Sequence, residues 1–350
     1  MDCNMFFLEP VPPFRLDLTV WALRRRPENV VDRWDGLTYR RVLSLRPGTV
    51  EIAVTQVAPP KAPRLSISVL GQPLDPLLRA DVTAILERLL GFRIDLRAFY
   101  RLASREKQLG DLARRFQGMK PPRYESLFES LIVGIASQQV SRVVSILVLN
   151  RLAAECGPKI SDRGVAAHAF PRPQDLAGAR PNKLRQLGFS RQKERAMTAL
   201  ARSLDAEGLS LEPLAILPDA EAVERLCGLP GVGRWTAEYV LLRGLGRTHV
   251  FPGDDVGARN NLKRWLRLET PLDYEAVHCA LRRWRPYAGL IYFLMLLDCL
   301  AQAECLQESA AKPPMGQTDK HQNIKNNYES KSIETIGSTR PVHLAGLHPA

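Results

Sequence analysis

The N-terminal part of the chain alternates apolar and polar residues along three stretches. This period of two occurs at residues 14–20, 50–54 and 65–69, with apolar positions Phe14, Leu16, Leu18 and Val20, then Val50, Ile52 and Val54, and then Leu65, Ile67 and Val69. Such alternation predicts strands with one buried face. Gly36, the stretch 46–48 (Arg-Pro-Gly) and the Pro59-Pro60 pair predict breaks between strands, and residues 21–26 suggest a short helix. We therefore expect a small α+β domain over residues 1–74.

From about Asp75 the apolar residues recur at helical spacing. The first stripe contains Val82, Ile85, Leu86, Leu89 and Leu90. A second helix should begin at Ser126, which forms a capping-box pattern with Glu129, and should run toward Leu147,. Further stripes follow at 184–187, 197–204, 223–226, 239–242, 262–266 and 291–297. Residues 75–305 are thus predicted to form an all-α domain of many short helices.

The remaining residues, 306–350, differ in composition. They are rich in Lys, Gln, Asn, Ser, Pro and Gly and show little apolar periodicity, so we predict a disordered tail,. The longest apolar run, 290–297, is too short to span a bilayer, and the N-terminus lacks the pattern of a secretory signal,. These features predict no membrane partner and a cytoplasmic protein.

Net charge gives the first indication of a partner. The chain has 49 Lys and Arg against 37 Asp and Glu, a net charge of +12, of which only +1 lies in residues 306–350. A basic folded region suits a polyanion such as nucleic acid, although a generally arginine-rich proteome would give the same excess. The six cysteines contain no Cys-x-x-Cys pair and the histidines no metal-ligand spacing, so we expect reduced thiols and neither a metal nor another cofactor,.

A Gly/Pro turn between two predicted helices is the most informative motif. It reads Leu226-Cys-Gly-Leu-Pro-Gly-Val-Gly-Arg-Trp-Thr-Ala-Glu-Tyr-Val240, with one helix ending near Cys227 and the next beginning at Val232 or Gly233. Glycines let a partner approach the backbone, and a helix N-terminus attracts anions. The motif therefore predicts a phosphate-binding hairpin that reads no base sequence, although a plain helix–helix turn is the simpler alternative.

Two adjacent aspartates follow this hairpin. Asp254 and Asp255 lie at the end of a Gly/Pro loop, Val250-Phe-Pro-Gly, where a helix running to about Leu266 is predicted to begin. One aspartate is enough to cap a helix. The pair therefore suggests one capping and one working carboxylate.

The hairpin, the Gly/Pro loop and the aspartate together resemble the helix-hairpin-helix, Gly/Pro, Asp superfamily of DNA glycosylases. Within it, the chain resembles the bacterial 3-methyladenine DNA glycosylase II subfamily. Further segments support the resemblance: Gly134-Ile-Ala-Ser-Gln-Gln-Val-Ser141, Leu187-Gly-Phe-Ser-Arg-Gln-Lys193, Gly233-Arg-Trp-Thr-Ala237 and Arg283-Trp-Arg-Pro-Tyr287. The implied fold is a TATA-binding-protein-like α+β domain followed by an all-α helix-hairpin-helix glycosylase domain.

The resemblance implies monofunctional hydrolysis of the N-glycosidic bond of alkylated purines during base excision repair. Alignment of the Asp pair puts the catalytic aspartate at Asp255 and leaves Asp254 as the cap. The damaged base would be flipped out of double-stranded DNA. Candidates for stacking on it are Trp235, Tyr239, Trp284, Tyr287 and Tyr292, each of which could instead be core,. Candidates for DNA contact are Gln138, Gln139, Leu229, Gly231, Val232, Gly233, Arg234 and Thr236, with Gln138-Gln139 at the wedge position,.

Two departures from related branches refine this expectation. Trp235 stands where bifunctional relatives place a lysine, which argues against a lyase activity, and the C-terminal cysteine set of the iron–sulfur branches is absent. We expect a monomer associated with the nucleoid. Excision of another damaged base (uracil, hypoxanthine or an oxidised purine) and a non-catalytic DNA-binding role remain alternatives.

Overall fold

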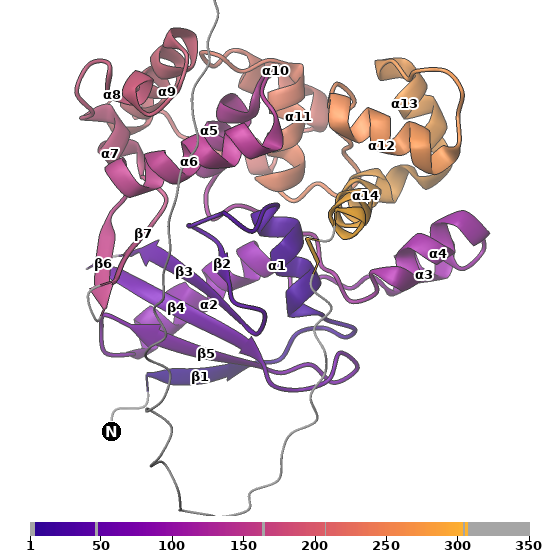
Figure 1. The fold of residues 1–350 in the computed structure, drawn as a ribbon, viewed down its shortest axis with the longest axis horizontal. Helices are drawn as coiled ribbons and strands as arrows, with labels where there is room; N and C mark the ends of the chain where they lie inside the picture. Colours follow the sequence, from indigo (N-terminus) through magenta and orange to yellow (C-terminus); the bar gives the residue numbers. More distant parts are fainter. Residues whose placement is uncertain (1–3, 46–47, 163–164, 207, 304, 307–350) are drawn as a thin grey trace, which may run out of the picture. The chain divides into compact units, whose positions relative to one another are not determined.

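The N-terminal region is built on a five-stranded antiparallel sheet. In the computed structural model, which describes residues 4–45, 48–162, 165–206, 208–303 and 305–306, the strand order is β1-β5-β4-β3-β2 (Figure 1). The strands are β1 (Met5–Leu8), β2 (Arg33–Trp34), β3 (Thr38–Ser44), β4 (Thr49–Gln56) and β5 (Leu65–Leu70). The alternating apolar residues of β4 and β5 are fully buried, which confirms both predicted strands.

The strand predicted at residues 14–20 is wrong, because this segment forms helix α1 (Leu16–Arg24). Eight of its nine residues are buried, all except Asp17. A helix buried on nearly every side has no polar face, so its 3.6-residue period is invisible and the alternation around Asp17 is coincidental. The predicted breaks at Gly36 and Pro59-Pro60 lie between strands, whereas residues 46–47 are outside the described ranges.

Strand β3 escaped prediction because it contains buried charge. Arg41 is fully buried and forms ion pairs with Asp32 (2.8 Å), Glu129 (2.7 Å) and Glu125 (3.1 Å). Complete pairing is what allows a guanidinium into a core. Because Glu125 and Glu129 lie at the start of a later helix, this cluster joins the sheet to the helical region.

Helices make up most of the chain after β5. They are α2 (Pro76–Leu90), α3 (Arg97–Ala103), α4 (Lys107–Arg115), α5 (Leu127–Ser137), α6 (Arg142–Cys156), α7 (Pro173–Ala177), α8 (Lys183–Gln186), α9 (Arg191–Asp205), α10 (Asp219–Cys227), α11 (Arg234–Arg243), α12 (Val256–Leu266), α13 (Tyr274–Leu281) and α14 (Ala288–Gln302), with 3-10 turns at Glu212–Ala215 and Arg282–Tyr287. Every predicted helical stripe falls on one of them. Ser126 caps α5 as expected, accepting a hydrogen bond from the Glu129 N–H at 3.0 Å.

Two details of the helical prediction are wrong. The helix predicted to run toward Leu147 is interrupted at residues 138–141, where Ser141 caps the separate helix α6. The region is also not all-α, since β6 (Lys159–Asp162) and β7 (Val165–His168) pair as an antiparallel hairpin. Ala167 and Ala169 pack with Val42 of β3, so contacts with the sheet stabilise this hairpin. Its two strands have four residues each, too few for an alternating pattern to be recognised in the sequence.

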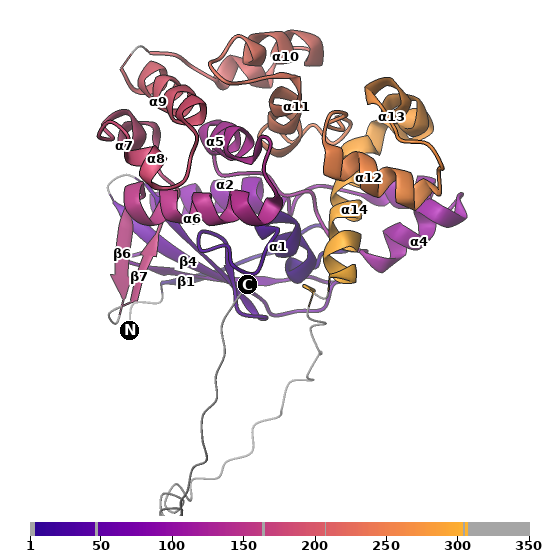
Figure 2. The ribbon, with the colours of Figure 1, turned by 45° about the horizontal axis from the view of Figure 1, so that its top comes forward.

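Apolar packing is continuous between the sheet and the helices. One core cluster contains residues of α1, α2, β4 and β5 together with α5, α6, α9, α10 and α11, and a second joins α1 to α3, α4, α12 and α14. Both views place α10 on the side of the helical region that lies away from the sheet (Figures 1 and 2). The division at residue 74 therefore stays a prediction, and the predicted tail, 306–350, lies outside the described residues except for Leu306. Within the described part of the chain, no helix has the length and apolar character needed to cross a membrane.

Candidate active site

The hairpin between α10 and α11 uses two glycines for two different reasons. Gly231 has a φ of +73°, and a Cβ there would lie 2.5 Å from the Cβ of Ala196, so only glycine fits,. Gly233 is the N-cap of α11, and a Cβ there would meet no atom within 4 Å. No side chain caps the first N–H groups of α11, and a helix N-terminus of this kind favours an anion,.

Several residues predicted to contact DNA make contacts within the protein that hold this hairpin in shape. The Gln138 side-chain amide donates hydrogen bonds to the Gly231 carbonyl (2.8 Å) and to Thr236 Oγ1 (2.9 Å). Thr236 and Val232 are buried, and the Val232 N–H donates to the Leu229 carbonyl. Leu229 is half-buried against the core. These contacts hold the hairpin in place, and those of Gln138 join it and the start of α11 to the end of α5.

Gln139 differs from its neighbour Gln138. It is exposed and has a φ of +54°, in the left-handed region that non-glycine residues rarely adopt,. The turn between α5 and α6 thus presents the Gln139 side chain outward while Gln138 is tied to the hairpin.

Asp254 is not the cap that the sequence suggested. Its carboxylate accepts a 2.7 Å hydrogen bond from Arg234 Nε, and the Arg234 guanidinium lies 3.8 Å from the centre of the Tyr274 ring. Both partners of this ion pair are partly exposed. Arg234, predicted to bind phosphate, is therefore already engaged by the protein and would have to share its charge with Asp254.

Asp255 is both the cap of α12 and the carboxylate that faces a cavity. Its Oδ1 accepts from the Ala258 N–H at 2.8 Å, and its Oδ2 accepts from the Tyr292 hydroxyl at 3.1 Å. Burial and the charge of Asp255 raise the pKa of Tyr292, so this hydroxyl stays protonated and donates. The cap of α12, which the sequence assigned to Asp254, is therefore Asp255, and the same residue lines the cavity.

Glu238 of α11 holds the loop before Asp255, a role that the sequence did not reveal. Its carboxylate accepts from the Gly253 N–H (3.0 Å) and from the Tyr274 hydroxyl (2.6 Å). Burial raises the pKa of Glu238. Because α11 also carries the hairpin N-terminus, Glu238 ties the Gly/Pro loop to the hairpin through one helix.

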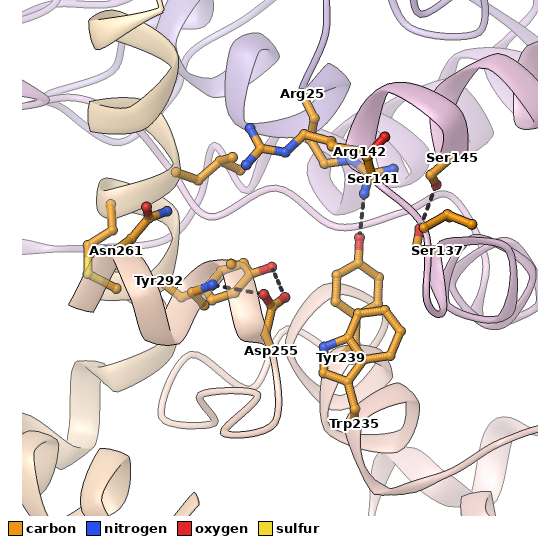
Figure 3. Close-up of a pocket in the computed structure, with 15 residues that line it drawn as sticks. Arg25, Ser137, Ser141, Arg142, Ser145, Trp235, Tyr239, Asp255, Asn261 and Tyr292 are labelled. Atoms are coloured by element: carbon orange, nitrogen blue, oxygen red, sulfur yellow. Dashed lines mark hydrogen bonds between the residues drawn. The ribbon is translucent and has the colours of Figure 1, made fainter. Parts of the chain in front are cut away.

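A cavity of about 310 Å³ lies beside Asp255 and is walled by aromatic side chains. Trp235 and Tyr239 of α11 stack on each other, with ring centres 5.5 Å apart, and Tyr292 of α14 lies beside Asp255 (Figure 3). The volume is in the ~300–1,000 Å³ range of small-ligand sites. Trp235, Tyr239, Tyr292 and Asp255 are thus brought together as predicted.

Trp284 and Tyr287 do not line this cavity, so the structure does not bring them together with the other residues predicted to stack on the base. Trp284 is fully buried and donates from Nε1 to Glu106 Oε1 at 3.0 Å. Tyr287 packs edge-on against Phe99. Both pack in the core near α3, α4 and α14. The sequence alone does not distinguish an aromatic residue in a core from one that lines a pocket.

The cavity is also lined by residues that were not among the predicted site residues. Arg25 enters from the end of α1, and Ser137, Ser141, Arg142 and Ser145 come from the α5–α6 region. Arg25 is one of three consecutive arginines, of which Arg24 is buried as well, and nothing in that run distinguishes the one that lines the cavity.

A second cavity, of about 730 Å³, is lined by other residues of α11. It is lined by Arg234, Glu238, Tyr274 and His278 among others, and it does not contain Asp255. Within the described ranges, no group of three or more His, Cys, Asp and Glu side chains could hold a metal ion. The cavity beside Asp255 is therefore the candidate active site, and its chemistry rests on one carboxylate, aromatic rings and arginines.

Known proteins with similar sequences and structures converge on one family. Residues 132–286 match the family described as HhH-GPD superfamily base excision DNA repair protein. DNA-3-methyladenine glycosylase 1 of Schizosaccharomyces pombe is 30% identical over 164 residues, which are 46% of this chain and 68% of that protein. The structure of a 3-methyladenine DNA glycosylase from Archaeoglobus fulgidus superposes with a TM-score of 0.72 at 26% identity, covering 83% of this chain and 97% of that one.

A longer relative shares only part of its length with this chain. The probable bifunctional transcriptional activator/DNA repair enzyme AlkA of Mycobacterium tuberculosis is 32% identical over 206 residues, which are 59% of this chain and 40% of that protein. The match in sequence and fold coincides with the hairpin, the Gly/Pro loop and Asp255. The chain therefore belongs to the HhH-GPD superfamily of base excision DNA repair proteins.

Proposed function

We propose that this protein is a monofunctional DNA glycosylase that hydrolyses the N-glycosidic bond of alkylated purines of the 3-methyladenine type during base excision repair. The observation that carries the proposal is the Asp255 carboxylate at the edge of a cavity walled by Trp235, Tyr239 and Tyr292. Relatives named as 3-methyladenine DNA glycosylases support the choice of substrate.

The geometry supports a dissociative hydrolysis. A base flipped out of the duplex would enter the cavity and lie against Trp235 and Tyr239. As the bond to the base breaks, C1′ of the sugar becomes oxocarbenium-like, and a fixed carboxylate stabilises that positive charge. Asp255 is held by the Ala258 N–H and by Tyr292. Because both interactions are in place before substrate arrives, the carboxylate needs little reorganisation, and it can also orient the attacking water or accept its proton.

The partner in this proposal is double-stranded DNA containing a damaged base. The N–H groups at the start of α11 would bind a phosphate near Gly231 and Gly233, and the basic surplus of the chain adds sequence-independent attraction,. Gln139, exposed beside the cavity residue Val140, would occupy the gap left by the flipped base,. The Arg234–Asp254 pair would open or share its charge on binding.

The same proposal includes several further expectations. Trp235 lies in the cavity wall with no amine, so an associated lyase activity is not expected,. We also propose that the sheet with α1 and α2 is of the TATA-binding-protein-like type, that the protein acts as a monomer without a cofactor, and that it works at the nucleoid in the cytoplasm.

Base release from methylated DNA tests the function. Purified protein is incubated with DNA treated with a methylating agent, and the released bases are separated by chromatography. We expect free 3-methyladenine from the wild-type protein and its release at a rate lower by at least about 10²-fold from Asp255→Asn. DNA binding without release of any damaged base would favour the non-catalytic alternative and contradict the proposal.

A further inference from the structure

Helix α11 carries two pairs of side chains that both lead to the candidate active site. Trp235 and Tyr239 are four residues apart and form the aromatic wall of the cavity (Figure 3). Arg234 and Glu238 are also four residues apart, so they lie together on a neighbouring face of the helix, about 100° away. This second face holds the loop before Asp255. One helix therefore sets both the aromatic wall and the approach to the carboxylate.

Residues 252–255 form a tight turn that ends at Asp255. The Asp255 N–H donates to the Pro252 carbonyl at 3.0 Å, which is the hydrogen bond of a β-turn. The first central residue of this turn is Gly253, and its N–H donates to the Glu238 carboxylate at 3.0 Å. A buried side chain of α11 thus holds the backbone two residues before the carboxylate that faces the cavity.

Close packing against α13 keeps the turn at this place. A Cβ at Gly253 would lie 2.7 Å from Cδ2 of Tyr274 and 3.1 Å from Nε2 of His278, so the absence of a side chain lets the turn come this close,. The hydroxyl of the same Tyr274 donates to Glu238 at 2.6 Å. The turn, α11 and α13 therefore meet at one carboxylate.

The second central residue of the turn, Asp254, is held in a different way. It accepts from Arg234 at 2.7 Å, and both side chains of this pair are partly exposed. Arg234 is the first residue of α11, where a DNA phosphate would bind,. A phosphate there would draw on the Arg234 charge and weaken its hold on Asp254. The hydrogen bonds of Glu238, which is buried, would stay in place.

Resting on the proposed function, we propose that Glu238 is a positioning residue for the reaction, which keeps the Asp255 carboxylate aligned with the sugar once DNA is bound. Glu238 does not line the cavity beside Asp255, so it acts through the Gly253 N–H and the turn. A misplacement of about 1 Å at a catalytic group can cost about 10²-fold in rate. Loss of Glu238 should therefore lower the rate of base release and leave DNA affinity unchanged.

A double-mutant cycle tests this inference. Single-turnover release of 3-methyladenine is measured for Glu238→Ala in the wild-type background and in the Asp255→Asn background, together with binding to an abasic duplex. In the wild-type background we expect a rate lower by about 10²-fold and unchanged binding. In the Asp255→Asn background we expect little further loss, because no charge is left to position. Equal losses of rate in both backgrounds, or a loss confined to DNA binding, would overturn the inference.

Three further variants define the role of the Glu238 contacts. Glu238→Gln should regain most of the rate, because its amide keeps an oxygen for the Gly253 N–H. Arg234→Gln should lose more affinity than rate, and the same pattern as Glu238→Ala would count against separate roles for the two residues. Glu275→Ala is the matched control, because Glu275 is an exposed carboxylate that lines the same second cavity as Glu238. It should leave both rate and affinity unchanged.

Thermal melting verifies that Glu238→Ala is folded. If it is not, Tyr274→Phe replaces it in the cycle, because this change removes one donor to Glu238 and keeps the ring. Its smaller loss of rate must also disappear in the Asp255→Asn background, and an additive loss or none at all overturns the inference. A normal rate for folded Glu238→Ala would contradict the inference while base release by the wild-type protein still supports the proposed function. Failure of the wild-type protein to release any base would contradict both.

Discussion

Replacing Asp255 by asparagine separates the charge of this residue from its structural role. Asparagine caps a helix about as well as aspartate does, so its side-chain oxygen can still accept from the Ala258 N–H. The Tyr292 hydroxyl, which now donates to Asp255, can instead accept from the new amide. We therefore expect the free energy of unfolding to change by less than about 1 kcal/mol, whereas Asp255→Ala would also lose the cap.

The expected loss of rate follows from the lost charge. Two unit charges about 4 Å apart attract each other by roughly 4 kcal/mol at the effective dielectric constant of about 20 that suits sites near a protein surface. Since each 1.36 kcal/mol corresponds to about tenfold in rate, the full effect is about 10³-fold. Asp255 is half-buried rather than enclosed, and solvent screens part of the attraction. We expect a loss of about 10² to 10³-fold in single-turnover excision.

The assay is release of 3-methyladenine from methylated DNA with protein in excess, together with binding to an abasic duplex. Asp255→Asn should bind nearly as well as wild type. Asp254→Asn is the matched control, because its carboxylate pairs with Arg234 at the surface, where ion pairs contribute about 0–1 kcal/mol,. Near-normal activity of Asp255→Asn would refute the electrostatic role, and an inactive Asp254→Asn beside an active Asp255→Asn would move the catalytic role to Asp254.

Three further predictions concern binding, reaction course and stability. DNA affinity should fall steeply between about 50 and 200 mM salt and depend little on the sequence around the lesion, because backbone N–H groups and arginines contact phosphates. Titrations at two salt concentrations check this, and a constant affinity would contradict phosphate binding by the hairpin. The product should be an intact strand with an abasic site, so borohydride added during turnover should trap no protein–DNA adduct, and a good yield of adduct would end the monofunctional interpretation. Burial raises the pKa of Glu129 to about 7 despite its contact with Arg41. Because the folded protein then binds a proton that the unfolded chain releases near 4.5, stability should decrease as pH rises from about 4.5 to 7,. Urea unfolding should show this slope for wild type and a flatter one for Glu129→Gln, and equal slopes would place the pH dependence elsewhere.

The parts of the fold that the sequence predicted well are those in which local chemistry decides the structure. The helix ends at Cys227 and Leu266 are correct, because turn glycines, capping groups and short-range periodicity act within a few residues,. The same holds for β4 and β5, whose alternating residues bury one face. The prediction failed for α1, which is buried on nearly every side and so lacks alternating apolar and polar faces. It also failed for β3, where the buried Arg41 interrupts the apolar pattern.

The sequence by itself therefore determined the hairpin, the loop and the presence of a carboxylate beside them, since these lie within thirty residues of each other. Only the tertiary structure decided which aspartate faces the cavity, that Trp235 lines it while Trp284 is core, and that Arg25 enters it. Those outcomes depend on how α11, α12 and α14 pack against each other and against α1. Such contacts join residues more than two hundred positions apart. Local sequence patterns extend over only a few residues, so they do not reveal which distant residues will come into contact.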